Sequence, residues 1–243
     1  MKGYQEDLAY IHDVGFGAFA LQSAPGLLRL LEQSGVKEEL VVDLGCGSGL
    51  WARELDKAGY PVLGIDQSAA MLRIARRRVP EARFRRASFL QAELPSCGAV
   101  TAIGEVFNYL FDSANQLDTL VRFFDRVREA LRPGGLFIFD VAGPGRSGGP
   151  GRRQRHFQGD DWAVLVETEE DDKHAILTRH ITSFRRVGKR YRRTDEVHRL
   201  RLYRAPDLLA VLRSLGFRGR LLRGYGEARF PRGLVGIRAR KQV

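Results

Sequence analysis

One stretch constrains the fold of this chain more than any other. Apolar residues lead through an acid into three alternating glycines, and a helical pattern follows, in the run Val41-Val42-Asp43-Leu44-Gly45-Cys46-Gly47-Ser48-Gly49. Glycines between a buried strand and a helix let a ligand lie against bare backbone, since a Cβ atom would block the approach. The first N–H groups of the helix also lack partners within it. The sequence therefore predicts an α/β fold with a ligand cradle at this turn.

The spacing of the glycines separates two kinds of cradle. Dinucleotide-binding loops read G-x-G-x-x-G and place a pyrophosphate at the helix N-terminus. Here the pattern is G-x-G-x-G from Gly45 to Gly49, and Asp43 stands two residues before the first glycine. This form resembles the first motif of the class I S-adenosylmethionine-dependent methyltransferases.

Two further motifs support the resemblance. Residues 60–66 read as a second strand that ends in Asp66, where a carboxylate can accept hydrogen bonds from both hydroxyls of a ribose. Residues 131–140, with Pro133-Gly134-Gly135 before an apolar run, are similar to the family's turn and fifth strand. The resemblance covers residues 36–142 well and 203–240 loosely.

The alternation of strand and helix patterns predicts a parallel sheet with right-handed crossovers. The expected strands lie near 40–43, 61–65, 82–86, 99–103 and 136–141, and the expected helices near 49–58, 69–79 and 114–131. In the resembled family, a last pair of strands, here near 218–224 and 233–240, closes the sheet with an antiparallel seventh strand. The expected fold is a doubly wound, mostly parallel, seven-stranded Rossmann-like sheet.

A length of 243 residues, of which 44% are hydrophobic, suits one domain over residues 1–243. Two helices are expected in the N-terminal part, at 5–12 and 24–34, and three strands in the insertion, at 162–167, 175–184 and 191–202. The domain divides into an N-terminal helical lid (1–35), a cofactor-binding core (36–142), an antiparallel β insertion after the fifth strand (143–202), and a C-terminal helix with closing strands (203–243). The insertion is interpreted either as a cover for the substrate or as an oligomer interface.

The resemblance implies a set of residues at the cofactor, S-adenosylmethionine. Asp43 would hold its amino end through the loop or a water, or else cap the next helix. Asp66 would hold the ribose, while Ser68 is better placed to cap the following helix. Where the family often has Gly-Asp, this chain has Ser88-Phe89, so the adenine contacts depart from the pattern. The full expected set is Asp43, Gly45, Cys46, Gly47, Gly49, Asp66, Gln67, Ser88, Phe89, Gly104 and Glu105.

The segment after the fourth expected strand should face the acceptor, because ligands bind beyond the carboxyl ends of parallel strands. The candidate substrate contacts are Asn108 and Tyr109, joined by Phe16 and Trp162 from the lid and the insertion; Tyr109 fits core packing equally well. A general base is needed only if the acceptor must lose a proton. The candidates for that role are Glu105, Tyr10 and His12.

Composition bears on partners. The net charge of +11 invites a nucleic-acid interpretation, but arginine is spread along the whole chain and the basic stretch 179–201 follows the acidic run 167–172. We therefore expect no nucleic-acid partner. No apolar run reaches the roughly 18–20 residues that span a bilayer, and no signal peptide is recognised, which favours a cytoplasmic protein without a membrane contact. We expect a monomer or homodimer.

Two chemical features are also expected to be absent. No C-x-x-C or H-E-x-x-H pattern occurs, so no metal site is predicted. Cys46 and Cys97 should lie at opposite ends of parallel strands, so no disulfide is predicted.

The resemblance implies methyl transfer from S-adenosylmethionine to the oxygen or nitrogen of a small-molecule acceptor, with S-adenosylhomocysteine as product. The methyl group would pass by in-line displacement, so that the protein mainly aligns the reactants and excludes water. Three alternatives stay open: an RNA methyltransferase, a nicotinamide-dependent oxidoreductase, and a cofactor-binding module without catalysis.

Overall fold

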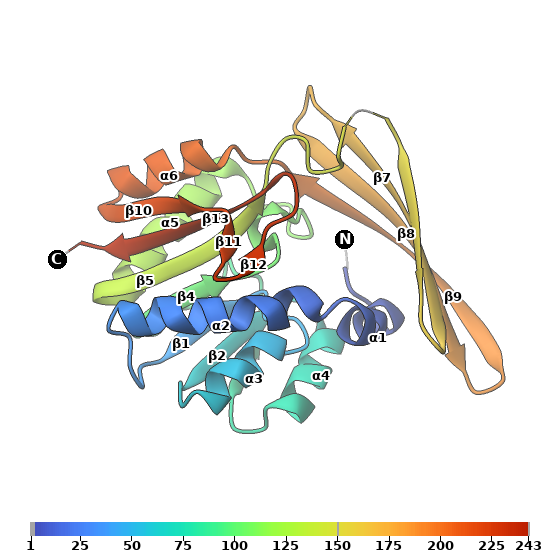
Figure 1. Ribbon diagram of the computed structural model, residues 1–243, viewed down its shortest axis with the longest axis horizontal. Helices are drawn as coiled ribbons and strands as arrows, with labels where there is room; N and C mark the ends of the chain where they lie inside the picture. Colours follow the sequence, from blue (N-terminus) through green and yellow to red (C-terminus); the bar gives the residue numbers. More distant parts are fainter. Residues whose placement is uncertain (1–2, 150, 243) are drawn as a thin grey trace.

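The structure is a computed structural model that describes residues 3–149 and 151–242 (Figure 1). Its centre is a seven-stranded sheet with the strand order β10-β13-β5-β4-β1-β2-β3. Five strands run parallel, and β13 pairs antiparallel with both β5 and β10. The bounds are β1 Val41–Leu44, β2 Val62–Asp66, β3 Arg83–Arg86, β4 Cys97–Ala102, β5 Leu131–Ala142, β10 Phe217–Leu222 and β13 Leu234–Lys241. The predicted fold class is confirmed.

Helices cover both faces of this sheet because each carries one apolar stripe. In α5 (Leu117–Ala130), Leu120, Phe123, Phe124 and Val127 recur at helical spacing and are buried. With α6 (Ala205–Ser214), this helix packs into the apolar core on one face. The core on the other face takes α2 (Ala18–Gln33) and α3 (Leu50–Lys57). The connection between β2 and β3 contains α4 (Ala69–Arg78).

The N-terminal part holds two helices, as predicted, but both are longer than expected. The first, α1, spans Glu6–Gly15, and α2 follows after Phe16 and Gly17. Pro25, near the expected start of the second helix at residue 24, lies inside α2. No single helix among the described residues is long and apolar enough to cross a membrane; α1 and α2 meet that length and composition only as a pair bent by 60°.

The insertion forms a separate antiparallel sheet of four strands, β6 to β9 in sequence order. Their bounds are β6 Arg153–Gln158, β7 Trp162–Asp171, β8 Ile176–Val187 and β9 Arg190–Arg201. Three of them were predicted. The prediction missed β6 because every one of its residues is exposed, and its sequence lacks the alternation that marks a half-buried strand. The prediction also missed a short hairpin of β11 (Gly224–Tyr225) and β12 (Ala228–Arg229).

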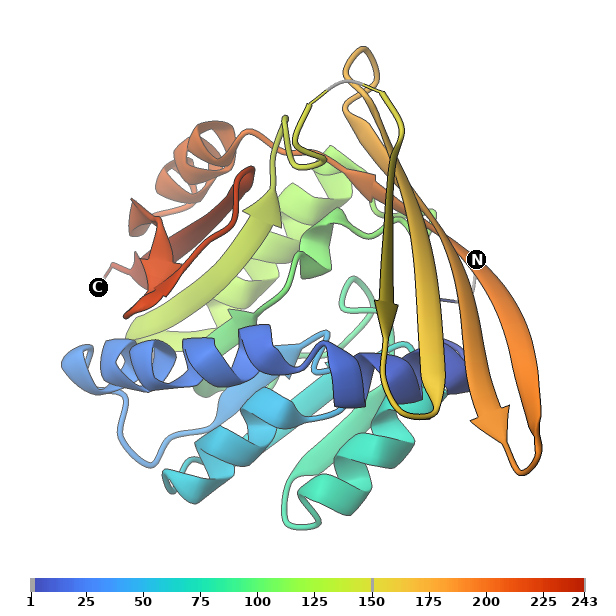
Figure 2. The same cartoon turned by 45° about the vertical axis from the view of Figure 1, so that its right-hand side comes forward.

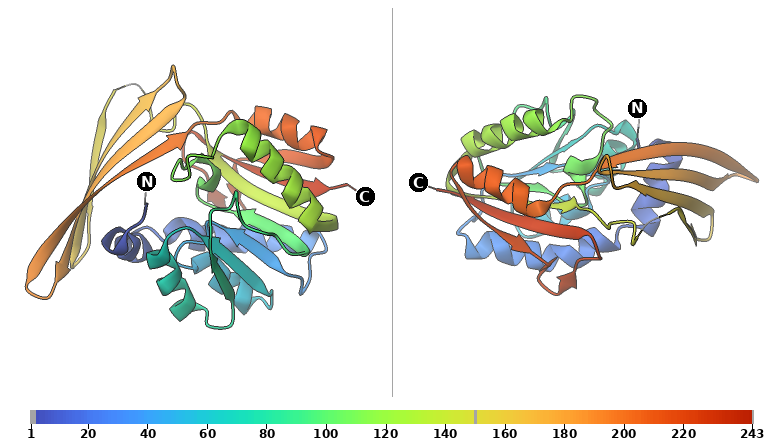
Figure 3. Two further views of the ribbon diagram at one scale, coloured as in Figure 1. Left: turned by 180° about the vertical axis from the view of Figure 1, so that it is seen from behind. Right: turned by 90° about the horizontal axis from the view of Figure 1, so that it is seen from above.

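This second sheet stands beyond one side of the core, and α1 lies beside it (Figures 2 and 3). Leu8 and Ile11 of α1 are buried against Trp162, Val164 and Ile181 of the sheet. The N-terminal helix and the insertion thus share one apolar cluster. Together they enclose the space above the core sheet.

Both cysteines are buried and free. Cys46 follows the end of β1, whereas Cys97 begins β4, and these two strands are parallel. The prediction that they form no disulfide is confirmed.

Candidate cofactor and acceptor site

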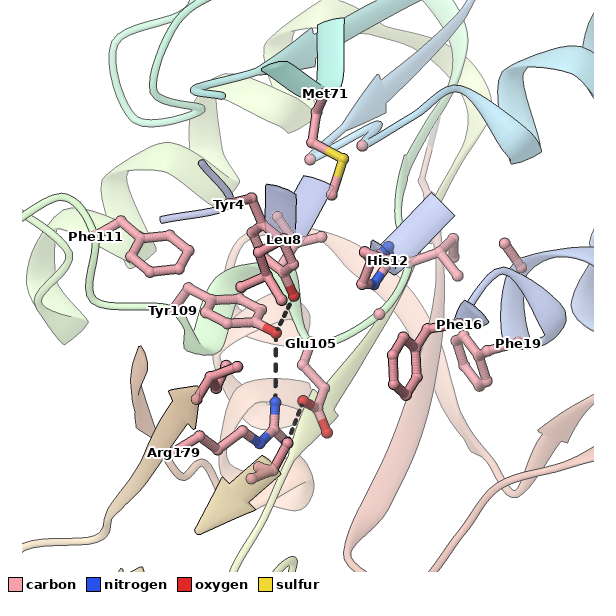
Figure 4. A pocket seen from close by; sticks show the side chains of 18 of the residues that line it. Tyr4, Leu8, His12, Phe16, Phe19, Met71, Glu105, Tyr109, Phe111 and Arg179 are labelled. Atoms are coloured by element: carbon pink, nitrogen blue, oxygen red, sulfur yellow. Dashed lines mark hydrogen bonds and ion pairs between the residues drawn. The ribbon is translucent and has the colours of Figure 1, made fainter. Parts of the chain in front are cut away.

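A cavity of about 610 Å³ lies at the carboxyl ends of the parallel strands (Figure 4). Its floor comes from the turns after β1, β2 and β4, where Gly47, Asp66 and Gly104 contribute to the lining. Residues of α1 and of the insertion, among them His12 and Arg179, complete the walls. The cavity therefore occupies the crevice where open α/β sheets bind ligands.

The glycine turn after β1 fits a backbone cradle. Gly45 and Gly47 have positive φ angles of 62° and 54°, a conformation that favours glycine. A Cβ atom on Gly45 would approach Val106 to 2.7 Å, whereas one on Gly47 would meet only a carbonyl oxygen at 4.0 Å. Gly45 thus allows the turn to pack against the segment after β4, and Gly47 leaves bare backbone beside the cavity.

The other two predicted residues of this turn support it from behind. Cys46 and Gly49 are not among the residues that line the cavity. Cys46 packs beneath the turn, where a Cβ atom on Gly64 would lie 2.9 Å from its Sγ. Gly49 lies against Ala75 of α4, whose Cβ would be 3.0 Å from an added Cβ. Both residues shape the loop without facing the ligand space.

Asp66 fastens the turn after β1 to the turn after β2. Its Oδ2 accepts a hydrogen bond from the backbone N–H of Gly47 at 2.9 Å, and its Oδ1 accepts one from Ser68 at 2.7 Å. Burial raises the pKa of Asp66, although these hydrogen bonds oppose the shift. Each carboxylate oxygen keeps a further lone pair, and Asp66 lines the cavity, so it can also accept from ligand hydroxyls.

Ser68 caps α4, as predicted. Its Oγ accepts a hydrogen bond from the N–H of Met71 at 3.1 Å and donates one to the carbonyl oxygen of Tyr4 at 2.7 Å. One hydroxyl thus satisfies a helix N-terminus and ties the N-terminal segment to the core.

We expect Ser68→Ala to lower the free energy of unfolding by about 1 kcal/mol, the usual loss for a helix N-cap. Urea unfolding measures the difference. The matched control is Ser113→Ala, because Ser113 is an exposed loop serine. Equal stabilities of the two variants would show that neither hydrogen bond of Ser68 contributes.

Asp43 lies below the turn, outside the lining of the cavity. It is buried, and its Oδ1 accepts a hydrogen bond from Thr101 Oγ1 at 2.9 Å. Burial raises the pKa of Asp43 to about 7, against the effect of the Thr101 hydrogen bond. The alternative that Asp43 caps α3 is wrong, because the N-cap of that helix is Gly49 and no side chain caps it. Asp43 is therefore separated from the cavity by the loop.

The far end of the cavity has an apolar wall and a polar neighbour. Phe89 lines it and also packs against Phe107, with ring centroids 5.1 Å apart. Gln67 lines both this cavity and an adjacent hollow that Ser88 lines. The buried Oγ of Ser88 has no hydrogen-bond partner within the described part of the chain. An unsatisfied buried hydroxyl beside a flat apolar wall fits a planar ligand with polar edges.

The turn after β4 is held in place by Asp140, at the end of β5. Its carboxylate accepts hydrogen bonds from the N–H groups of Gly104, at 3.0 and 3.1 Å, and Glu105, at 2.7 Å, and from the hydroxyl of Tyr225, at 3.1 Å. Burial raises the pKa of Asp140 to about 6 in spite of these bonds. Gly104 and Glu105 both have positive φ angles, 93° and 64°. The one signal for Asp140 in the sequence is its position as an acid near the end of an apolar strand.

Glu105 turns its carboxylate toward two arginines of the insertion. Arg146 Nε donates to its Oε1, and Arg179 Nη2 donates to its Oε2 at 2.9 Å. Burial alone would raise the pKa of Glu105, but the positive charges of Arg179 and Arg146 outweigh it and hold the pKa below the usual value. Sequence reasoning missed both arginines, because nothing local distinguishes them in an arginine-rich region.

A chain of polar contacts continues from Arg179. Its Nη1 donates to the hydroxyl of Tyr109 at 3.4 Å, and that hydroxyl shares a hydrogen bond with the hydroxyl of Tyr4 at 3.0 Å. Figure 4 shows these side chains along one wall of the cavity. Tyr109 therefore lines the cavity, as one of its two interpretations required.

His12 and Phe16 of the N-terminal segment line the cavity as well. Burial lowers the pKa of His12 to about 4, so the imidazole is neutral at pH 7. Its Nδ1 has no hydrogen-bond partner among residues 3–149 and 151–242. His12 thus offers a neutral ring at the cavity wall.

Three predicted acceptor or catalytic residues lie outside the lining. Tyr10 donates to Asp161 at 3.0 Å and packs beneath the guanidinium of Arg185. Trp162 belongs to the apolar cluster between α1 and the insertion. The buried amide of Asn108 is used by the backbone of Ala142 and Arg201, so it joins the core to the insertion. These positions could not be placed from sequence, since each depends on a partner distant in the chain.

The described residues contain no group of three or more His, Cys, Asp or Glu side chains that could hold a metal ion.

Comparisons with known proteins agree with this geometry. A family model described as a methyltransferase domain matches residues 41–135. The chain is 28% identical to a putative methyltransferase of Geobacillus sp. (strain WCH70) over 194 residues. The aligned residues cover 73% of each protein.

Solved structures share the whole fold. An S-adenosylmethionine-dependent methyltransferase from Clostridium acetobutylicum ATCC 824 superposes with a TM-score of 0.81 at 21% identity, over 98% of both chains. The sugar N-methyltransferase KedS8 from Streptoalloteichus sp ATCC 53650 superposes with a TM-score of 0.76 at 21% identity, over 100% of this chain and 95% of that one.

The seven-stranded sheet and the glycine turn define a Rossmann-like methyltransferase fold. Together with the matching domain model over residues 41–135 and the relatives, they support an enzyme of the class I S-adenosylmethionine-dependent methyltransferases. These similarities imply S-adenosylmethionine as its cofactor. The bare backbone at Gly47, the carboxylate of Asp66 and the unsatisfied Ser88 hydroxyl all fit that molecule.

Proposed function

We propose that this enzyme methylates a small-molecule acceptor and releases S-adenosylhomocysteine. The observation that carries the proposal is the enclosure of the cavity by α1 and the insertion, which leaves room for a small molecule beside the cofactor turn. The printed name of the KedS8 neighbour, a sugar N-methyltransferase, describes an enzyme of the same fold with such an acceptor. The G-x-G-x-G spacing and the family match favour this function over a nicotinamide-dependent oxidoreductase.

In the proposed arrangement, Asp66 holds the ribose hydroxyls, and Gln67, Ser88 and Phe89 surround the adenine. The backbone at Gly45, Gly47 and Gly104 faces the methionine part. When bound, the cofactor supplies a methyl group on a positively charged sulfur, already activated for transfer. The residues of the cavity then have to align the acceptor and exclude water.

The proposed base is His12 if the acceptor must lose a proton. Glu105 is poorly suited, because two arginines occupy its carboxylate and lower its pKa. Tyr10 lies outside the cavity. Since the pKa of His12 is about 4, the imidazole is a weak base that accepts a hydrogen bond readily but a full proton reluctantly. This suits an acceptor that needs little or no deprotonation.

The N-terminal segment is proposed to act as a lid over both halves of the cavity. On one side, the N–H groups of Tyr4 and Gln5 donate to the carboxylate of Glu196 in β9 at 2.7 and 2.8 Å. On the other, Asp13 pairs with Arg78 of α4 at 2.8 Å, and Tyr4 accepts from Ser68. These contacts bind the segment to both sides of the cavity, so opening it should disturb the cofactor end as well as the acceptor end.

We expect calorimetry to detect tight binding of S-adenosylmethionine and S-adenosylhomocysteine and little binding of NAD. The reason is the G-x-G-x-G spacing of the glycine turn, which differs from the G-x-G-x-x-G spacing of dinucleotide-binding loops. Mass spectrometry of reactions with S-adenosylmethionine and pooled small molecules should then detect products heavier by one methyl group. Tight NAD binding without heat from either sulfur compound would contradict the cofactor assignment. Methylation of RNA but of no small molecule would instead contradict the proposed acceptor class.

A further inference from the structure

The acceptor side of the cavity carries more positive than negative charge. Among the residues that the structure describes, four arginines and two carboxylates, Asp66 and Glu105, line the cavity. Asp66 lies at the cofactor turns, where Gly47 and Ser68 hold it. All four arginines belong to the insertion: Arg146, Arg153, Arg155 and Arg179.

The charge is concentrated where Arg146 and Arg179 meet Glu105. The side chains of Arg146 and Arg179 are 22% and 20% exposed, and that of Glu105 is 7% exposed. One buried carboxylate therefore pairs with two partly buried guanidinium groups. The cluster thus keeps one net positive charge within the wall of a partly open cavity. Charge that is removed from water without a partner is costly, which favours a negatively charged occupant.

Both arginines also have N–H donors that are not used in the contacts with Glu105 and Tyr109. A guanidinium has five N–H donors. In the described structure, Arg179 uses Nη2 toward Glu105 and Nη1 toward Tyr109, and Arg146 uses Nε toward Glu105. The remaining N–H groups are suited to a planar or tetrahedral oxyanion, which guanidinium groups bind with paired hydrogen bonds.

Apolar side chains line the same cavity as this charged cluster. Val164, Leu177 and Ile181 of the insertion line the cavity, as does Phe16 of the N-terminal segment. A ligand that fills this space therefore needs an apolar body next to its charged group. An amine would meet the opposite environment, because Glu105 is already paired with two arginines.

We propose that the acceptor is a small molecule with an apolar body and an oxyanion, a carboxylate or a phosphate, which binds to Arg146 and Arg179. This inference rests on the proposed function and specifies its substrate class. The oxyanion complements the positive sulfur of the bound cofactor as well as the arginine pair. Arg146 and Arg179 are then specificity-determining residues that Glu105 holds in place.

The test uses the full chain saturated with S-adenosylhomocysteine and four probes of similar shape: phenylacetate, phenyl phosphate, neutral phenylacetamide and cationic phenethylamine. Calorimetric titration at low ionic strength should show binding of at least one oxyanion at least tenfold tighter than that of the amide or the amine. The comparison of the two oxyanions distinguishes a carboxylate site from a phosphate site.

The arginines are tested by Arg179→Gln and, separately, Arg146→Gln. Each should weaken oxyanion binding about tenfold or more, because the loss of a hydrogen bond to a charged group has roughly this effect. The affinity for S-adenosylhomocysteine should stay within about twofold. Arg190→Gln is the matched control, because Arg190 is exposed at the far end of the same sheet and should change nothing. Thermal melting of each loaded variant verifies that it is folded.

Three results would overturn the proposal. The first is binding of the amide or the amine as tight as that of the oxyanions, and the second is the failure of both oxyanions to bind. The third is a loss of S-adenosylhomocysteine affinity in Arg179→Gln and Arg146→Gln without a change in probe binding, which would assign the arginines to the cofactor. Failure of the wild-type protein to bind S-adenosylhomocysteine at all would instead contradict the proposed function.

Discussion

Asp66→Ala is expected to weaken the binding of S-adenosylhomocysteine by about 10- to 150-fold, which corresponds to about 1.5–3 kcal/mol. The substitution removes the carboxylate proposed to accept from the ribose. It also releases the N–H groups of Gly47 and Ser68, so that the turns after β1 and β2 are no longer fastened to each other. The loss of direct contacts and the loss of a prearranged loop both lower the affinity for S-adenosylhomocysteine.

The measurement is isothermal titration calorimetry of the purified variants with S-adenosylhomocysteine. Asp56→Ala serves as the control, because Asp56 is exposed near the end of α3 and is not among the residues that line the cavity. Asp66→Asn separates the two contributions, since an amide keeps one acceptor oxygen but presents its NH₂ to a second N–H donor. An Asp66→Ala protein that melts normally and binds with wild-type affinity would show that this carboxylate holds no part of the cofactor.

Features that are local in sequence could be predicted. The strands around the cofactor turns were placed within about two residues, and the glycine turn and Asp66 followed from one βαβ unit. Each of these depends on a periodic pattern and on residues fewer than 25 positions apart. The hydrogen bond from Gly47 to Asp66, for instance, spans 19 residues. A short strand–helix–strand segment largely determines its own geometry.

Features that depend on distant partners could not be predicted. Arg179 lies 74 residues from Glu105 and Arg146 lies 41 residues from it, yet both pair with its carboxylate. These contacts change the chemistry of Glu105 from a candidate base to an acceptor of two ion pairs. A basic residue in an arginine-rich stretch carries no sign of which acid it will meet.

The misplaced candidates follow the same rule. Asn108 was expected at the acceptor because it follows the fourth strand, and Trp162 because an aromatic residue of the insertion could exclude water from the acceptor. In the structure, the Asn108 side-chain amide donates to the backbone carbonyl oxygens of Ala142 and Arg201. Trp162 packs in the apolar cluster with residues of α1. The β6 strand shows the converse, because it pairs with β7 through the backbone although all of its residues are exposed.

Phe107 is a residue whose loss should strongly destabilise the protein. It is fully buried between α5 and the core sheet, with its ring 5.1 Å from those of Phe89 and Phe139 and 5.5 Å from that of Phe124, measured between centroids. These distances fit edge-to-face aromatic packing, which adds to the free energy of burial. The same short segment continues to Tyr109 in the cavity wall, so it joins the core to the acceptor side.

Phe107→Ala is therefore expected to lower the free energy of unfolding by about 3–5 kcal/mol, the usual range for a buried Phe replaced by Ala. Urea unfolding followed by circular dichroism measures it. The control is Tyr191→Ala, since Tyr191 is 59% exposed on β9, and its replacement should change stability by less than about 0.5 kcal/mol. Because a smaller aromatic cluster can still close the sheet, the variant should fold at low temperature and bind S-adenosylhomocysteine there. A loss below about 1.5 kcal/mol with an unchanged denaturant slope would mean that the aromatic cluster repacks and that the segment after β4 does not depend on this ring.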